Sequence, residues 1–178
     1  ALYHSEGNDF HYLAATGDTL ESGGGSPRPV YRRENISRVS ISGFELSLDY
    51  LIISSLSVQA SYSYNHSIIK SYPDPDPGLE GKMLAEVPPH LFYAGITWRS
   101  RLFSALLECS YTDAQYADDL NQVRLEEYFL LNARIQLNPV ERIRVYLNCQ
   151  NILDNQFIDR KNKLSPGRYF SGGIKIFI

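Results

Sequence analysis

Apolar and polar residues alternate one by one through much of this 178-residue chain. From Phe103 to Tyr111 every second residue is apolar or aromatic, and the last stretch, 168–178, repeats the pattern. Because successive side chains of a β-strand point to opposite faces, a period of two predicts strands with one apolar and one more polar face. No segment has a helical period strong enough to compete, so the chain is predicted to be all-β.

The alternation predicts about eight strands, of which the first is only weakly patterned. They are expected at residues 1–14, 36–50, 56–65, 92–99, 103–111, 129–137, 143–150 and 168–178. Tight turns are expected near residues 53, 100 and 140, and long loops at 17–29, 72–89, 113–127 and 155–167. Short turns at one end and long loops at the other are typical of antiparallel transmembrane barrels. The predicted fold is therefore a transmembrane β-barrel meander.

The two faces of the predicted strands differ in charge. The apolar face is almost free of charge, and we expect it to contact lipid; its central members are Phe103, Leu107, Leu131, Ile135, Val145 and Leu147. The opposite face carries Glu45, Asp49, Glu108, Arg134, Arg144 and Lys175. So many charges suit a watery lumen better than a packed interior. Tyr50 and Trp98 lie on the apolar face beside tight turns, as in an interfacial aromatic girdle.

Composition excludes two other classes of protein. No apolar run approaches the roughly 18 residues that suggest a membrane-spanning helix, and the net charge of −3 gives no basic footprint for nucleic acid. The two cysteines, Cys109 and Cys149, are too few for a disulfide scaffold. Both are expected on the apolar face with one strand between them, about 9.6 Å apart and beyond disulfide reach.

Four short motifs resemble the C-terminal part of the barrel of TonB-dependent outer-membrane receptors. They are Gly43-Phe44-Glu45-Leu46-Ser47-Leu48-Asp49-Tyr50 with the preceding Asn35, Val87-Pro88-Pro89-His90, Asn151-Ile152-Leu153-Asp154-Asn155-Gln156-Phe157, and Gly167-Arg168-Tyr169-Phe170. Each motif is weak by itself, but the four occur in the order of the family. The resemblance covers roughly residues 30–178.

The resemblance implies that residues 1–178 form a single unit, an arc of a 22-stranded barrel whose plug and first strands lie outside this chain. It implies a location in the outer membrane of a Gram-negative bacterium. It also implies import of a bulky ligand such as a ferric siderophore, cobalamin or haem. The implied partners are the TonB complex acting through the plug, the barrel-assembly machinery, outer-membrane lipid and a small-molecule ligand such as a metal chelate.

No residues predict catalysis, a metal site or a cofactor. The histidines His4, His11, His66 and His90 lack metal-ligand spacing, and no serine lies in an elbow such as GxSxG. The loop acids are expected to be solvated rather than to bind a hard cation; they are Asp74, Asp76, Asp118, Asp119, Glu126 and Glu127. The chain is therefore predicted not to be an enzyme.

The sequence leaves the ligand-binding residues unknown. The loops at 17–34, 71–88, 118–126 and 155–167 are the candidates that the resemblance implies, without a choice of residues within them. The inner-face charges have two interpretations, a polar network packed against the plug or a ligand path, and the first is favoured.

Two alternative folds remain open. One is a self-contained eight-stranded outer-membrane barrel with a structural or adhesion role; it is disfavoured because the weak first strand would have to close the ring with residues 168–178. The other is a soluble ligand-binding barrel, which the inner charges disfavour.

Overall fold

The computed structural model describes residues 1–21, 27–71, 78–160 and 163–177, with the side chains of all but 9–17, 29 and 31–37. These residues form antiparallel β-strands, as the alternation predicts. No helix among the described residues is long and apolar enough to cross a membrane.

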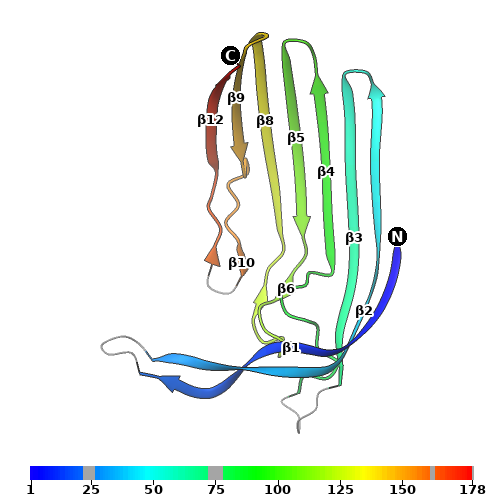
Figure 1. Cartoon of the computed structure of the whole chain (residues 1–178), viewed down its shortest axis with the longest axis vertical. Helices are drawn as coiled ribbons and strands as arrows, with labels where there is room; N and C mark the ends of the chain where they lie inside the picture. Colours follow the sequence, from blue (N-terminus) through cyan, green and yellow to red (C-terminus); the bar gives the residue numbers. More distant parts are fainter. Residues whose placement is uncertain (22–26, 72–77, 161–162, 178) are drawn as a thin grey trace.

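One sheet of eight strands forms a tall wall (Figure 1). In spatial order its strands are β1 (Leu2–Leu20), β2 (Arg28–Ile53), β3 (Leu56–Ser71), β4 (His90–Arg99), β5 (Phe103–Thr112), β8 (Tyr128–Val140), β9 (Ile143–Gln150) and β12 (Tyr169–Ile176). Two small hairpins lie outside this sheet: β6 (Gln115–Tyr116) with β7 (Arg124–Leu125), and β10 (Ile158–Arg160) with β11 (Lys163–Leu164).

The wall is a meander in which strands that follow one another along the chain are neighbours. Within the described residues its order begins at β1 and ends at β12. Figure 1 shows the short turns after β2, β4 and β8 at one end of the wall, and the longer connections at the other. We call these the turn end and the loop end. This placement confirms the predicted asymmetry between turns and loops.

The register of the strands confirms the two predicted faces. Residues directly opposite one another in an antiparallel pair share a face. Leu107 on β5 lies opposite Ile96 and Ala133, while its neighbour Glu108 lies opposite Asn132. Apolar rows therefore cross the sheet on one face, which we call the outer face. Rows of Ser, Thr, Asn, Gln, Tyr and charged residues cross the other, the inner face.

The outer face has no protein layer over it. Leu107, Ile135 and Leu147 are 45%, 48% and 55% exposed, whereas a soluble barrel would bury such residues in its centre. The buried apolar residues of the described chain are instead Val39, Ile69, Leu79 and Leu125, all near the loop end. This arrangement agrees with a wall whose outer face contacts hydrocarbon, and it disfavours the soluble barrel.

The strands β1 and β2 are longer than the sequence predicts. Strand pairing continues to Leu20 in β1 and begins at Arg28 in β2, inside the stretch expected to be a loop at 17–29. The paired ribbon turns away from the wall at the loop end (Figure 1). A free-standing ribbon needs backbone pairing but no single buried face. Its sequence therefore carries little alternation, and the pattern did not predict it.

Tyrosine rings cover glycines at three places on the inner face. A Cβ atom added to Gly95 would lie 2.9 Å from the hydroxyl of Tyr93, and one added to Gly173 would lie 2.6 Å from that of Tyr146. Tyr3 covers Gly43 in the same way. The missing side chains leave room for the rings to lie flat against the sheet.

The assignment of the two faces is tested by placing the same charge on either face of β5. Leu107→Arg puts the charge on the outer face, where a midplane Arg costs roughly 2–4 kcal/mol in a lipid-facing wall. Ser110→Arg puts it on the inner face, opposite Tyr93 and Leu130 and two residues after Glu108. We expect Leu107→Arg to reduce the heat-modifiable, folded protein in outer-membrane fractions strongly, and Ser110→Arg to reduce it little. Equal losses would argue against a lipid-facing outer surface.

Candidate functional site

The connection after β3 folds against the loop that contains β6 and β7. The amide of Asn121 holds the backbone of Met83 from both sides: the Met83 N–H donates to Asn121 Oδ1 and Asn121 Nδ2 donates to the Met83 carbonyl, each at 2.9 Å. The Glu86 N–H donates to the Tyr116 carbonyl at 2.7 Å. Two of the candidate ligand loops, 71–88 and 118–126, are thus joined into one unit.

An apolar cluster lies beneath this unit on the inner face. Val39 and Ile69 are fully buried and lie opposite each other on β2 and β3, and Leu79 of the connection packs against them. Leu84 and Leu120 come from the two joined loops and extend the cluster. The loops therefore fold inward over the inner face, toward the space that the wall borders.

Two of the loop acids, Asp118 and Asp119, bond to backbone amides, whereas Glu126 and Glu127 lie 3.5 and 3.6 Å from the Arg124 guanidinium. The two carboxylate oxygens of Asp118 accept the N–H groups of Gln122 and Val123 at 3.1 and 2.7 Å, and Asp119 accepts the Ala85 N–H at 2.9 Å. Within the described residues, no three His, Cys, Asp or Glu side chains gather as metal ligands. Asp74 and Asp76, two of the loop acids singled out in the sequence, lie outside the described residues.

Asp119 is the loop acid with an altered acidity. Burial raises its pKa above the ordinary value because it disfavours the charged form, and the neighbouring Asp118 adds to the effect. The hydrogen bond from the Ala85 N–H opposes the rise because it favours the carboxylate. At neutral pH the buried Asp119 carboxylate therefore costs stability. A neutral group that accepts the same hydrogen bond would not carry this cost.

A group of hydrogen bonds, which we call the clasp, joins the recognised motif at 151–157 to the one at 167–170. Asn151 is 5% exposed, accepts the Asn155 N–H at 3.0 Å and donates to the Asn155 carbonyl at 2.7 Å. Asp154 Oδ1 accepts the Arg168 N–H at 2.6 Å. A Cβ atom on Gly167 would lie 2.6 Å from that same oxygen, so a side chain at this position would have to displace the carboxylate. The motif after β9 thus fixes the start of β12.

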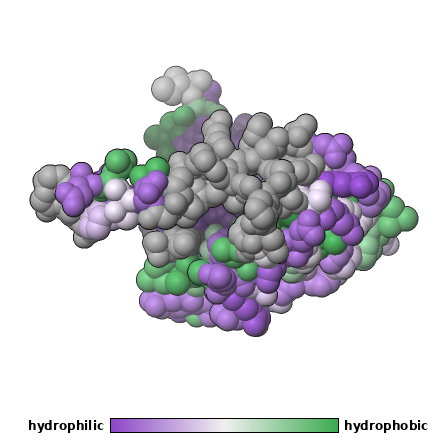
Figure 2. Space-filling model, turned by 90° about the horizontal axis from the view of Figure 1, so that it is seen from below, coloured by the Kyte–Doolittle hydropathy of each residue, from purple (hydrophilic) through white to green (hydrophobic). Residues whose placement is uncertain are grey.

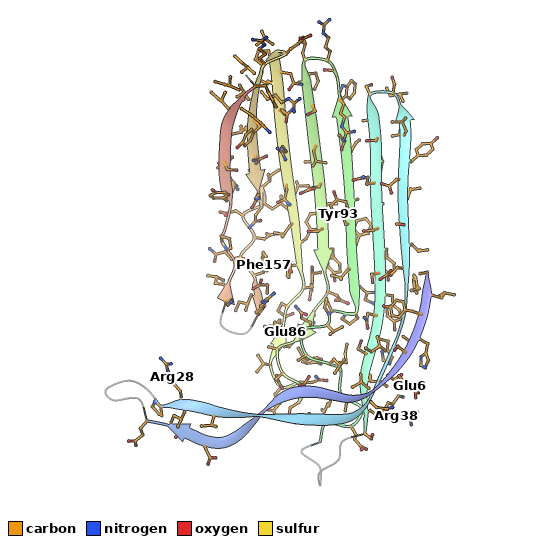
Figure 3. All side chains as sticks on the ribbon, in the orientation of Figure 1. Glu6, Arg28, Arg38, Glu86, Tyr93 and Phe157 are labelled. Atoms are coloured by element: carbon orange, nitrogen blue, oxygen red, sulfur yellow. The ribbon has the colours of Figure 1, made fainter. Side chains whose placement is uncertain are left out.

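The loop between these motifs contacts the β6–β7 unit. Gln115 is 8% exposed, and its Nε2 donates to the Asp159 carbonyl at 3.4 Å. Its Oε1 is buried without a hydrogen-bond partner in the described residues. Phe157, labelled in Figure 3, stacks on Tyr128 with ring centroids 3.8 Å apart. Gln115 belongs to no recognised motif and was not predicted. Phe157 ends the recognised motif at 151–157, but its stacking on Tyr128 was not predicted either.

Three of the four histidines belong to the wall and form no metal site. His90 contacts the Tyr62 hydroxyl through Nδ1 at 2.7 Å and lies 3.9 Å from Asp113. His4 and His66 are exposed. The side chain of His11 lies outside those described.

The inner-face charges divide along the height of the wall. Glu108 accepts hydrogen bonds from the Tyr93 hydroxyl at 3.1 Å and from Asn132 Nδ2 at 3.3 Å, and Figure 3 shows Tyr93 at about mid-height of the wall. Glu45 and Asp49 are exposed. Arg144 and Lys175 lie nearer the turn end and opposite each other on β9 and β12. Glu108 belongs to a polar network that joins neighbouring strands, whereas Arg134, Arg144 and Lys175 contact aromatic rings within the described part of the chain.

An uncovered apolar face, a polar inner face and long loops gathered at one end define a segment of an outer-membrane β-barrel wall. The chain belongs to the family "TonB dependent receptor-like, beta-barrel", whose sequence model matches residues 1–152. The family places the protein in the outer membrane of a Gram-negative bacterium, as predicted.

Similar proteins agree with this assignment. An iron-regulated outer membrane virulence protein from Vibrio cholerae serotype O1 is 35% identical over 72 residues, which cover 40% of this chain and 10% of that protein. The ferric yersiniabactin uptake receptor FyuA from Yersinia pestis matches 98% of this chain and 34% of its own, with a TM-score of 0.72 and 13% identity. The copper transporter OprC matches 98% of this chain and 28% of its own, with a TM-score of 0.74 and 16% identity.

The chain thus spans between 10% and 34% of the length of these similar proteins. At such low identity the two solved structures establish the fold alone. Together with the family match they agree with the predicted arc of a 22-stranded wall. No comparison identifies ligand-contacting residues, so the candidate loops stay a prediction.

The charge of Asp119 is tested by the isosteric amide. Asp119→Asn keeps Oδ1 as an acceptor for the Ala85 N–H and removes the buried charge. Because the pKa is raised on folding, the wild-type contact loses stability as pH rises from below the ordinary Asp value through the raised one. We expect slower hydrogen exchange at the Ala85 amide in Asp119→Asn than in the wild type at pH 7. Asp118→Asn loses one of its two acceptor oxygens, so exchange at the Gln122 or Val123 amide should be faster than in the wild type. Faster exchange at Ala85 in Asp119→Asn, or slower exchange at both Gln122 and Val123 in Asp118→Asn, would contradict the assignment.

The clasp before β12 is tested by a double-mutant cycle. Gly167→Ala should displace the Asp154 carboxylate from the Arg168 N–H and cost about 1–3 kcal/mol of stability, since a charge-assisted hydrogen bond is lost. The same change in an Asp154→Ala background should cost much less. Urea midpoints of the detergent-folded protein measure both. Additive costs would mean that Gly167 is required for another reason.

Proposed function

We propose that this chain is part of the barrel wall of a receptor that imports a bulky metal chelate, most plausibly a ferric siderophore, with energy delivered by the TonB complex. Residues 1–178 act in this proposal as one unit, the C-terminal portion of the barrel. The single observation that carries the proposal is the family match over residues 1–152. The wall performs no bond chemistry and is not an enzyme; it aims loops at the ligand.

Iron is favoured over other cargo by the names of similar proteins. The Vibrio relative is described as iron-regulated, and structures such as the siderophore receptor PiuA from Acinetobacter baumannii share the fold with a TM-score of 0.69. OprC, a copper transporter, shares it as well. Iron and copper are therefore the two metals to compare.

The loop end is the part of the chain that supports ligand capture. The described parts of the joined loops, 78–88 and 118–126, fold over the inner face, and the clasp and Gln115 hold described residues of the loop at 155–167 beside them. Viewed from that end, the described surface is largely hydrophilic with smaller hydrophobic areas (Figure 2). A polar mouth of this kind suits a solvated chelate, as binding sites often lie on loops that a rigid scaffold holds.

The self-contained eight-stranded barrel is the alternative. It requires β1 to pair with β12, whereas the sheet order of the described residues runs from β1 to β12 without that pair. The arc is therefore the better-supported arrangement.

Uptake of radioactive metal by cells that produce the protein tests the function. We expect uptake of iron presented as a ferric siderophore, and we expect it to disappear when TonB is inactivated in the same cells. Radioactive copper presented in parallel measures the rival cargo. Iron uptake that is independent of TonB, or copper uptake without iron uptake, would contradict the proposal.

A further inference from the structure

The outer face changes in character toward the loop end. Its middle part is aliphatic, with exposed residues such as Leu46. Phe44 then packs against Tyr62 and Tyr64, with ring centroids 5.6 and 5.8 Å apart. The ring of His90 lies 5.1 Å from that of Tyr64, and its Nδ1 lies 2.7 Å from the Tyr62 hydroxyl. We call Phe44, Tyr62, Tyr64 and His90 the aromatic row.

Polar side chains follow the aromatic row on the same face. Strand pairing puts Ser42 opposite both His4 and His66, and both histidines are exposed. These three residues line a hollow of about 510 Å³ together with Phe44 and Tyr64. No acidic residue of the described chain lines it. The hollow thus joins an aromatic side, nearer the middle of the wall, to a side of hydrogen-bonding groups.

Charged side chains come next, at the corner where β1 and β2 leave the wall. Arg38 is hydrogen-bonded to Glu6, and Figure 3 labels both. Lys70 is exposed and follows the inner-face residue Ile69, so it belongs to the outer face. Among the described residues Lys70 forms no ion pair. Two permanent cations and one carboxylate leave this corner positive beside the histidines.

The height of these residues matches the edge of the hydrocarbon. Leu56 on β3 lies opposite Trp98 beside a tight turn, and His66 follows ten positions later. About 9 to 11 residues of a tilted strand cross the hydrocarbon core. The aromatic row is therefore the girdle expected at that edge. The imidazoles and cations beyond it lie at the level of the lipid headgroups.

The rest of the barrel does not cover this surface. Both edges of β2 and of β3 are paired within the sheet, and further strands extend a barrel wall at its free edges, here β1 and β12, rather than over a face. The outer face therefore borders lipid. Because outer-membrane barrels carry their longer loops outside the cell, the lipid at the loop end belongs to the outer leaflet, where headgroups are phosphorylated sugars.

We propose that His4, Ser42, His66, Arg38 and Lys70 form a binding site for a phosphate on the headgroup of an outer-leaflet glycolipid. We call these five residues the headgroup site. The imidazole N–H groups and the hydroxyl donate hydrogen bonds to the phosphate oxygens, and the cations supply the opposite charge. The acyl chains of the same lipid lie along the aromatic row. The inference rests on the outer-membrane location of the family and not on the proposed import function.

Native mass spectrometry of the delipidated, full-length receptor that contains this chain tests the site. The two probes are lipid A with both phosphates and the same lipid with both phosphates removed. The wild type should bind the phosphorylated lipid more tightly. We expect His66→Gln with Lys70→Gln to weaken that binding about fivefold or more, the effect of one cation at a charged lipid surface. Affinity for the dephosphorylated lipid should not change, because the aromatic row remains.

Two matched variants separate phosphate binding from folding. Arg142→Gln removes an exposed cation at the turn end of the wall, and it should leave both affinities unchanged. Lys70→Arg keeps the charge of the headgroup site and should keep the preference for the phosphorylated lipid. Because His66 and Lys70 are exposed, the double variant should show the same heat-modifiable, folded band as the wild type.

Three results would overturn the inference. Unchanged affinity of the double variant for the phosphorylated lipid would show that the headgroup site does not bind phosphate. Equal losses for both lipids would mean that the substitutions disturb the apolar surface or the fold. Displacement of the bound lipid by inorganic phosphate would assign the site to a soluble anion instead. None of these results bears on metal uptake, so a failure of this inference is distinct from a failure of the proposed import function.

Discussion

Backbone hydrogen bonding in hydrocarbon is the constraint on which the rest of this structure depends. No water is available there, so each N–H and C=O must find its partner on a neighbouring strand. Long antiparallel strands in continuous register meet that demand, and register in turn fixes which side chains share a face. The apolar outer rows and polar inner rows follow directly. The face that a soluble protein would bury is the face left uncovered here.

The inner face borders polar surroundings, and its side chains also brace the sheet. Tyr93 does both: its ring lies over Gly95 and its hydroxyl donates to Glu108. Asn132 bonds the other carboxylate oxygen and also accepts the Asn151 N–H at 2.9 Å. A hydrogen-bond path thus runs from mid-wall to the clasp that orders β12. The lumen side is a connected polar structure rather than a row of solvated side chains.

Much of the wall could be predicted from sequence, because apolar and polar residues alternate in a strand that has lipid on one face and a polar lumen on the other. The strands β4, β5, β8, β9 and β12 and the tight turns were predicted within about three residues, whereas β3 runs six residues past its predicted end at 65 and the short strands β6, β7, β10 and β11 lie in predicted loops. The loop end could not be predicted in the same way. Val39 and Ile69 lie on the polar inner face by period, and they become a core only when Leu79 folds over them. The motifs at Asn151 and Gly167 were recognised as a resemblance, but their contact through Asp154 needed coordinates. The extension of β1 and β2 beyond the wall could not be predicted either, because its residues do not alternate regularly between apolar and polar.

The inner-face charges are held in two different ways. Glu108 shares its two oxygens between a tyrosine and an asparagine, and these hydrogen bonds join three neighbouring strands. Arg144 and Lys175 instead share the phenyl ring of Phe177, which orders them without neutralising them. Within the described wall, a carboxylate on the neighbouring strand would stabilise either cation better than a second cation does. The wall therefore does not account for this pair by itself, and its charge remains available to whatever faces the inner surface.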